Sequence, residues 1–192
     1  MAASRTNGRK CQTLYTGSNP TALKSQAMLV DAMFTLLQTV PYSEITVRRL
    51  TDTARVSRQT FYALFATREE VIQRRIQQVF DEYRAALATR VLTIHSLVAL
   101  FFAFYSRNQA IFNPLLANGL TNILTESARE CIATLKLTDM NHSYYVNGFV
   151  AAGLTQLLVD WSHRQDITVD DAIRLTERLI DASVLVTRDS GA

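Results

Sequence analysis

The chain has 192 residues, of which 48% are hydrophobic and 19% are charged, and its formal net charge is +3. This content is enough for one large domain, or for a small module joined to a larger one, and it excludes an intrinsically disordered chain. The two cysteines, Cys11 and Cys131, are far apart in the sequence and form neither a disulfide framework nor a metal-ligand pattern. We therefore expect a reducing, cytoplasmic setting in which Cys131 is a small buried hydrophobe.

Charge is distributed unevenly along the chain. Residues 1–84 carry 12 basic and 7 acidic side chains, whereas residues 85–192 carry 8 and 10. A basic first half indicates an anionic partner, such as nucleic acid or a membrane surface. The N-terminal charges precede no apolar run, which excludes a secretory signal, and the uncharged residues 91–106 are too few for the ~18 that span a bilayer. This stretch predicts a buried core helix of a soluble protein.

The first elements in chain order are a polar arm and a helix. Residues 1–18 are polar, basic and unpatterned, and we expect them to form a flexible arm. Asn19 and Pro20 then predict a helix start, with Asn19 as the cap, and Pro41 ends the helix. Its apolar positions recur at helical spacing and predict one buried stripe: Leu23, Ala27, Val30, Phe34 and Leu37.

Two short helices joined by a tight turn come next. Thr46 is expected to cap the first of them, and Ser57 the second, which covers residues 58–65. Only Arg55 and Val56 separate the first helix from the cap of the second. Two short helices on a tight turn, with longer helices on either side, are typical of a helix-turn-helix unit.

The remainder of the chain is predicted to be helical. Thr67 and Glu70 form a capping-box pattern, with Thr67 bonding forward and Glu70 reaching back, and they open a long helix. Further helices are expected over residues 91–106, 114–137, 143–163 and 168–186, the last with Asp171 at its capping-box position. Strand alternation is absent from the sequence. The predicted class is therefore all-α.

The last two predicted helices carry more apolar surface than one core face requires. A partner subunit would cover the second face, so we expect a homodimer. The residues expected in its interface are Val150, Leu154, Leu157, Trp161, Leu175 and Leu179.

Residues 45–71 resemble the DNA-binding domain of the TetR family of transcriptional regulators. The matching features are an apolar-Thr-Val opening at 45–47, Ala-x-Val-Ser at 54–57 and Thr-Phe-Tyr-x-x-Phe at 60–65. The resemblance covers roughly residues 22–72 and is looser afterwards. It differs at Arg55, where such families commonly have glycine because the turn needs a left-handed backbone, which costs a non-glycine residue roughly 1–2 kcal/mol. It implies a helix-turn-helix domain at 19–70 and a dimerisation and effector-binding domain at 71–192.

In a helix-turn-helix the second helix enters the major groove with its N-terminal residues first. Arg58 can bind guanine, and Gln59 adenine, through paired hydrogen bonds. Tyr62 suits a phosphate contact, and the helix starts at Thr46 and Arg68 are anion sites. The predicted DNA-binding residues are Thr46, Val47, Arg48, Ser57, Arg58, Gln59, Thr60, Tyr62 and Arg68.

The resemblance also implies a ligand pocket in the C-terminal domain. Aromatic residues that could line it are Phe101, Phe102, Tyr105, Tyr145 and Phe149. An aromatic core and a dimer interface explain the same residues equally well. Because the sequence offers no buried-looking cluster of charges, an apolar small molecule or a protein partner fits better than a phosphorylated metabolite.

The sequence contains no pattern that predicts an enzyme, a metal site or a cofactor. His95, His142 and His163 are scattered, and no phosphate loop or nucleophile motif is present. We therefore expect a dimeric repressor that binds a near-palindromic double-stranded DNA operator, has no membrane partner, and is released by an effector. The alternatives are a regulator of this fold that needs a protein partner and a helical interaction protein without autonomous DNA binding.

Overall fold

The computed structural model describes residues 17–91, 93–135 and 143–185, and in these ranges the chain forms α-helices and one 3-10 turn, with no strand. The all-α class is confirmed. No helix in the described part is long and apolar enough to cross a membrane. The elements are α1 (Pro20–Leu37), η1 (Tyr42–Glu44), α2 (Val47–Ala54), α3 (Arg58–Leu64), α4 (Arg68–Ala88), α5 (Ile94–Arg107), α6 (Gln109–Ala117), α7 (Thr121–Thr134), α8 (Ser143–Arg164) and α9 (Val169–Leu185).

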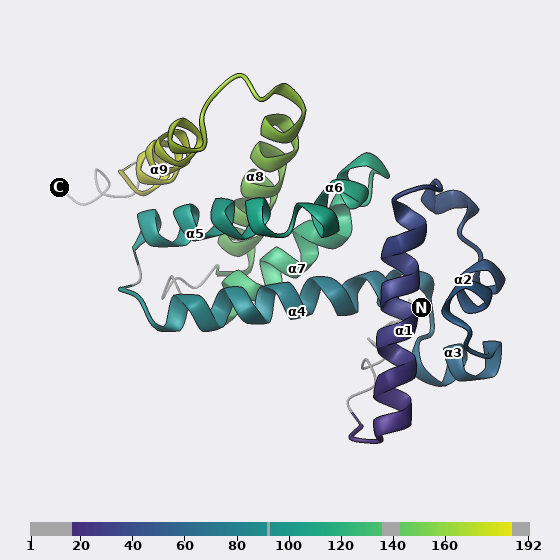
Figure 1. Cartoon of the computed structure of the whole chain (residues 1–192). Helices are drawn as coiled ribbons and strands as arrows, with labels where there is room; N and C mark the ends of the chain where they lie inside the picture. The colour runs from purple at the N-terminus through teal and green to yellow at the C-terminus, as the bar shows by residue number, and fades with distance from the viewer. Residues whose placement is uncertain (1–16, 92, 136–142, 186–192) are drawn as a thin grey trace, which may run out of the picture.

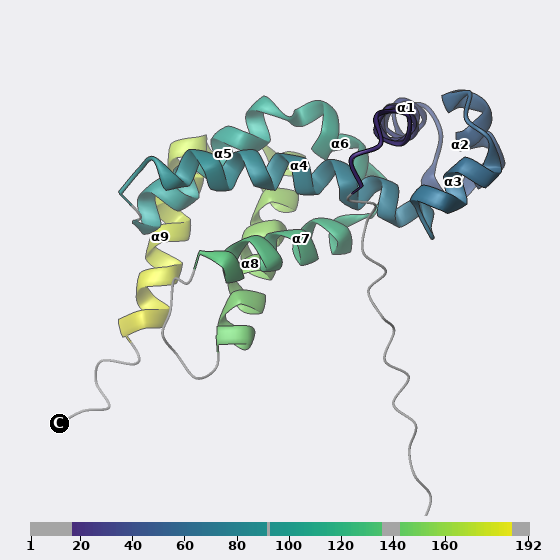
Figure 2. The same ribbon diagram turned by 90° about the horizontal axis from the view of Figure 1, so that it is seen from below.

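Two groups of helices lie at opposite ends of α4. Figures 1 and 2 show α1, α2 and α3 at one end of α4 and α5 and α7 beside the rest of it, with α8 packed on α7 and α9 on α5. We call residues 17–70 the head and the helices after residue 90 the body. Because α4 begins at Arg68 and packs on both α1 and α7, the predicted domain boundary at residue 70 lies inside a continuous helix.

The predicted caps of the head helices are confirmed. The side chains of Asn19, Thr46 and Ser57 accept hydrogen bonds from backbone N–H groups in the first turns of α1, α2 and α3, at 3.0, 3.1 and 3.0 Å. Each cap satisfies a donor that the helix leaves free. The caps fix where the short helices begin and so set the spacing between them.

The turn between α2 and α3 uses the left-handed backbone that was expected there. Arg55 has φ 54° and ψ 40°, and the Val56 N–H bonds to the Thr51 carbonyl at 3.0 Å, which closes the end of α2. This Schellman-like closure normally selects glycine. The chain therefore keeps the turn of the motif with an arginine in the strained position.

The apolar stripe predicted for α1 is wrong in its first turns. Leu23 is 41% exposed and Ala27 is exposed, whereas Leu29 and Met33 are fully buried. Figure 1 shows the purple start of α1 extending past α4, so this end of the helix has fewer neighbours to pack on. The core of the head therefore begins at the middle of α1 and not at its start.

The capping box at the start of α4 differs from its prediction in one bond. Thr67 bonds forward to the Glu70 N–H at 3.2 Å as expected. The Glu70 carboxylate, however, accepts the Ala66 N–H at 2.7 Å, one residue before the predicted partner. The box of α9 follows its pattern fully, since Thr168 and Asp171 each accept the other's backbone N–H, at 3.1 and 3.2 Å.

The single helix predicted over 114–137 is wrong, because the chain forms α6 and α7 with a break between them. Gly119 has φ +66°, a left-handed conformation that ends α6 after Ala117. Pro114 lies inside α6 and does not start a helix. The predicted ends at 137 and 186 lie outside the described residues.

Candidate nucleic-acid interface

The helix α3 separates its polar and apolar side chains onto two faces. Phe61, Leu64 and Phe65 are buried at 0%, 6% and 1% exposure and attach the helix to the core of the head. Arg58 and Gln59 in the first turn are exposed, and Arg58 forms no ion pair with any described residue. The helix therefore presents a free cation and a free amide at its N-terminal end.

The predicted partners of α3 lie on α2, which packs beside it (Figures 1 and 2). Thr46 and Arg48 are exposed, and Val47 is half-buried against the core. Arg48 is paired with Asp52 at 3.7 Å, but both side chains are more than 70% exposed, so the pair is weak and can exchange for a phosphate. Tyr62 on α3 is 56% exposed, with its ring edge against Phe61.

A shallow open hollow of about 470 Å³ extends this surface toward α1. Gln59 and Thr60 of α3 line it on one side, and Thr21 and Ser25 of α1 on the other. Sequence reasoning missed the contribution of α1 to this surface. The signal was present in the Asn19 cap, because the first turn of a capped helix offers N–H groups to an anion.

Arg68, one of the predicted phosphate ligands, has partners inside the head. Its guanidinium donates to the carbonyls of Ile45 and Tyr42 and lies 4.7 Å above the Tyr42 ring centre. The Tyr42 hydroxyl in turn donates to the Glu69 carboxylate at 2.5 Å. Arg68 is therefore half-buried and holds the start of α2 against the start of α4.

The contacts among Tyr42, Arg68 and Glu69 shift the pKa values of Tyr42 and Glu69. Burial, together with the hydrogen bond to Glu69, raises the pKa of Tyr42. Burial also acts to raise the pKa of Glu69, but the hydrogen bond from Tyr42 and the charge of Arg68 outweigh it, so the pKa lies below its ordinary value of 4.5. Glu69 is thus held as a carboxylate at neutral pH.

The residues predicted for an effector pocket differ in their burial. Phe101, Phe102 and Tyr105 are buried in the body, whereas Tyr145 and Phe149 on α8 are 72% and 73% exposed. Phe102 and Tyr105 pack edge-on against the Trp161 ring, with centroids 5.7 and 5.8 Å apart. The predicted set therefore divides between the core of the body and its surface.

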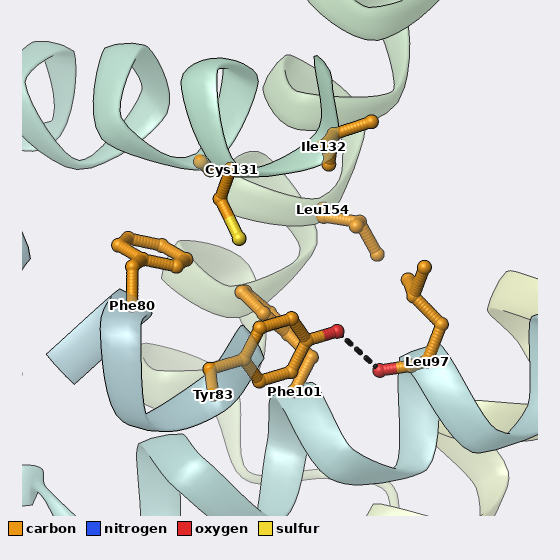
Figure 3. Close-up of a pocket in the computed structure, with 8 residues that line it drawn as sticks. Phe80, Tyr83, Leu97, Phe101, Cys131, Ile132 and Leu154 are labelled. Atoms are coloured by element: carbon orange, nitrogen blue, oxygen red, sulfur yellow. Dashed lines mark hydrogen bonds between the residues drawn. The ribbon is translucent and has the colours of Figure 1, made fainter. Parts of the chain in front are cut away.

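A small cavity of about 10 Å³ lies in the core between α4, α5, α7 and α8 (Figure 3). Phe101 and Leu154 contribute to its wall, and the Tyr83 hydroxyl beside it donates to the Leu97 carbonyl at 2.8 Å. Cys131 also lines it, and burial raises the pKa of this thiol to about 11. A space of this volume is at the lower limit for one water molecule.

A larger apolar groove of about 190 Å³ lies between α8 and α9. Four of the six residues predicted for the dimer interface line it, together with Phe149: Val150, Leu154, Leu157 and Leu179. Leu175 is half-buried, and so is Trp161, whose indole N–H donates to the Ile167 carbonyl at 3.0 Å. Trp161 therefore packs within its own subunit.

Acidic, histidine and cysteine side chains do not gather into a group of three that could hold a metal ion in the described part of the chain. The head instead carries the exposed cations of α2 and α3, Arg48 and Arg58. A helix-turn-helix head on a larger all-helical body is a transcription-regulator fold.

Comparison with known proteins makes this class more specific. The chain matches no family model and no curated protein. Among solved structures, a Listeria innocua protein has a TM-score of 0.73 at 19% identity, over 90% of this chain and 96% of that one. A TetR-family regulator from Streptomyces coelicolor has a TM-score of 0.68 at 16% identity, over 86% and 97%. A TetR transcriptional regulator from Streptococcus agalactiae has a TM-score of 0.61 at 20% identity, over 83% and 95%.

The chain therefore has the fold of TetR-family transcriptional regulators. At these identities the similarity establishes the fold alone. The resemblance found in residues 45–71 is confirmed at that level, and the fold extends over the body, where the sequence resemblance was loose.

Proposed function

We propose that the chain is a cytoplasmic homodimer that binds a near-palindromic DNA operator sequence-specifically and represses transcription until an effector releases it. The observation that carries this proposal is the first turn of α3, where Arg58 and Gln59 are exposed while Phe61 is fully buried behind them. A helix anchored in this way presents its leading side chains to base edges in the major groove.

The surface around α3 supports phosphate contacts on both sides. Thr46 and Arg48 lie at the start of α2, and Thr21 and Ser25 lie across the hollow on α1. Phosphate contacts of this kind fix the register of a protein on the duplex, while base contacts select the sequence. Arg68 is a weaker candidate than the others because the carbonyls of Ile45 and Tyr42 already occupy its guanidinium.

The proposed dimer is supported by the groove between α8 and α9. Phe149 and Leu179 at its edges are 73% and 60% exposed, which is unusual for side chains of this size. A second copy that covers this face would bring two heads together. The two α3 helices must then be able to reach a spacing of about 34–36 Å, which is one turn of DNA.

The effector step needs a conformational change in the body. The core cavity beside Phe101 is about 10 Å³, so a small apolar molecule that binds there has to select an opened conformation. A protein partner that binds the exposed Tyr145 of α8, which does not line the groove, is the second candidate for the regulating signal. Either signal acts only through its different affinity for the two states of the dimer.

Selection of genomic fragments by the purified full-length chain tests the proposal. The best fragment is then titrated against a scrambled fragment at several salt concentrations. Arg58→Ala should weaken binding to the selected fragment by about 1–3 kcal/mol and change binding to the scrambled one much less. Arg107→Ala removes the same charge from an exposed position on α5 and is the matched control.

The outcomes separate the candidate functions. A palindromic fragment, bound far more tightly than its control and sensitive to Arg58, supports an autonomous regulator. Equal loss in the two arginine variants would contradict base reading by α3. No enrichment from a folded dimer at low salt would favour the partner-dependent regulator or the helical interaction protein.

A further inference from the structure

A hydrogen bond joins the head to the body at the end of α6. The Tyr42 N–H donates to the Asn118 side-chain oxygen at 2.7 Å, and the Asn118 side-chain nitrogen donates to the Pro114 carbonyl at 2.8 Å. Both Tyr42 and Asn118 are half-buried. Because the first partner can only donate and the second can only accept, an asparagine amide satisfies both at once.

The Tyr42 N–H has no acceptor in its own part of the chain. Tyr42 is the first residue of η1, and the first N–H groups of a helical turn lack an internal partner. The acceptor comes instead from a residue 76 positions later in the sequence. Leaving a half-buried N–H without an acceptor costs free energy. This hydrogen bond therefore favours the placement of the head in which Tyr42 reaches Asn118.

Tyr42 connects Asn118 to the helix-turn-helix. Its carbonyl and its ring both meet Arg68, and its hydroxyl bonds to Glu69, so it is attached to the start of α4. Arg68 also bonds to the carbonyl of Ile45, the residue before the cap of α2. A displacement of the end of α6 therefore acts on the start of α2 through one tyrosine.

Helix packing also acts at this junction, but it is less directional than a hydrogen bond. Figures 1 and 2 show α6 beside α1, which it packs against, while α4 is the continuous connection between head and body. A single helix fixes the distance between two groups but permits bending and twisting along its length. A second, directional contact at Asn118 restricts that freedom.

We propose that Asn118 is a positioning residue that fixes the orientation of the head relative to the body through the backbone N–H of Tyr42. Without this contact the head samples more orientations about α4. For DNA binding, which rests on the function proposed above, a wider range of orientations lowers the affinity for an operator that needs both heads in register. Binding to random DNA, which needs no register, changes little.

Asn118→Ala tests the proposal, and Asn113→Ala is its matched control. Asn113 lies within α6, which Asn118 caps, and it also accepts a side-chain hydrogen bond, of 2.8 Å, but its partner is the Tyr105 hydroxyl within the body. Amide hydrogen exchange of Tyr42 is measured in the full chain by NMR. Asn118→Ala should accelerate it by about fivefold or more, the equivalent of one lost hydrogen bond, and Asn113→Ala should leave it unchanged.

A second measurement reports the orientation directly. In a Cys11→Ser background, spin labels at Thr53→Cys on α2 and Ala133→Cys on α7, both exposed positions, give a head-to-body distance distribution when labelled chains are diluted with unlabelled ones. The distribution should broaden in Asn118→Ala and not in Asn113→Ala. Unchanged exchange and an unchanged distribution in Asn118→Ala would overturn the proposal.

Asn118→Asp keeps the proposal testable if the alanine variant does not fold. The carboxylate retains an acceptor for the Tyr42 N–H but loses the donor to Pro114 and repels that carbonyl, so the exchange of Tyr42 should stay slower than in Asn118→Ala. Exchange in the aspartate variant as fast as in a peptide would overturn the proposal. If the wild-type chain fails to bind any operator, the proposed function fails, but exchange and distances still decide the role of Asn118.

Discussion

The head and the body of this molecule differ in what they leave exposed. In the head, the large apolar side chains exposed among the described residues are Leu23 and Tyr62, and the exposed surface around α3 carries the cations Arg48, Arg55 and Arg58. The body exposes a series on α8 and α9 that includes Phe149 and Leu179. The exposed surface of the head thus suits a charged partner, whereas the body has an apolar face that suits a protein partner.

The largest expected effect is the loss of stability when one core side chain is truncated in each region. Phe61 and Phe102 are both fully buried, one in the head and one in the body. Phe61→Ala and Phe102→Ala should each lower the free energy of unfolding by about 3–5 kcal/mol. Urea unfolding measures the loss, and hydrogen exchange locates it: in α1 to α3 for the first variant, and in α5 and α8 for the second.

The same two variants test whether the head and the body unfold separately. If Phe61→Ala accelerates exchange in α8 as much as in α3, head and body unfold as one cooperative unit. The continuous α4 would then carry the loss of the head core into the body. Distinct regions of faster exchange would support the division that the exposed surfaces suggest.

Local chemistry explains why so much of the head could be predicted from sequence. Caps at Asn19, Thr46 and Ser57 depend on residues within three positions of each other, and the strained turn at Arg55 depends on its immediate neighbours. Such signals are readable without knowledge of the tertiary structure.

Features that depend on distant segments could not be predicted in the same way. The internal partners of Arg68 come from Tyr42 and Ile45, and the break after α6 depends on the left-handed Gly119 within a sequence that is otherwise helical. Phe102 and Phe149 are the same residue type on predicted helices, and only the packing shows that Phe102 is buried in the core and Phe149 is exposed on the surface. Periodicity detects a helix; it does not identify the neighbour of each face.

A smaller effect is expected at two left-handed residues, one in each region. Arg55 in the head has φ 54° and Gln165 at the end of α8 has φ 48°, and both are exposed. Glycine relieves about 1–2 kcal/mol of strain but adds unfolded-state entropy, so Arg55→Gly and Gln165→Gly should each stabilise by up to about 1 kcal/mol. Thermal unfolding measures the gain.

DNA binding separates these two variants. Arg55→Gly removes a cation beside α3 and should weaken binding at low salt, whereas Gln165→Gly should not. A destabilised Arg55→Gly variant would show that the arginine side chain contributes more to the head than its backbone strain costs.

The smallest expected effect is the pH dependence of one hydrogen bond in the head, between Tyr42 and Glu69. The pKa of Glu69 is lower in the folded chain than its ordinary value of 4.5, so its bond from Tyr42 contributes stability above pH 4.5 that is lost as the pH falls through the folded value. Tyr42→Phe should therefore destabilise by less than about 1 kcal/mol at neutral pH, because the site is partly solvated, and the deficit should shrink in acid.

The matched variant in the body is Tyr105→Phe, which removes a hydroxyl bonded to the Asn113 amide at 2.8 Å. An amide acceptor does not titrate, so the deficit of this variant should be the same at neutral pH and below pH 4.5. Urea unfolding of both variants against wild type, across that range, checks the contrast. Parallel pH profiles would mean that the Glu69 carboxylate does not distinguish the head, and that its charge is satisfied by Arg68 with or without the tyrosine.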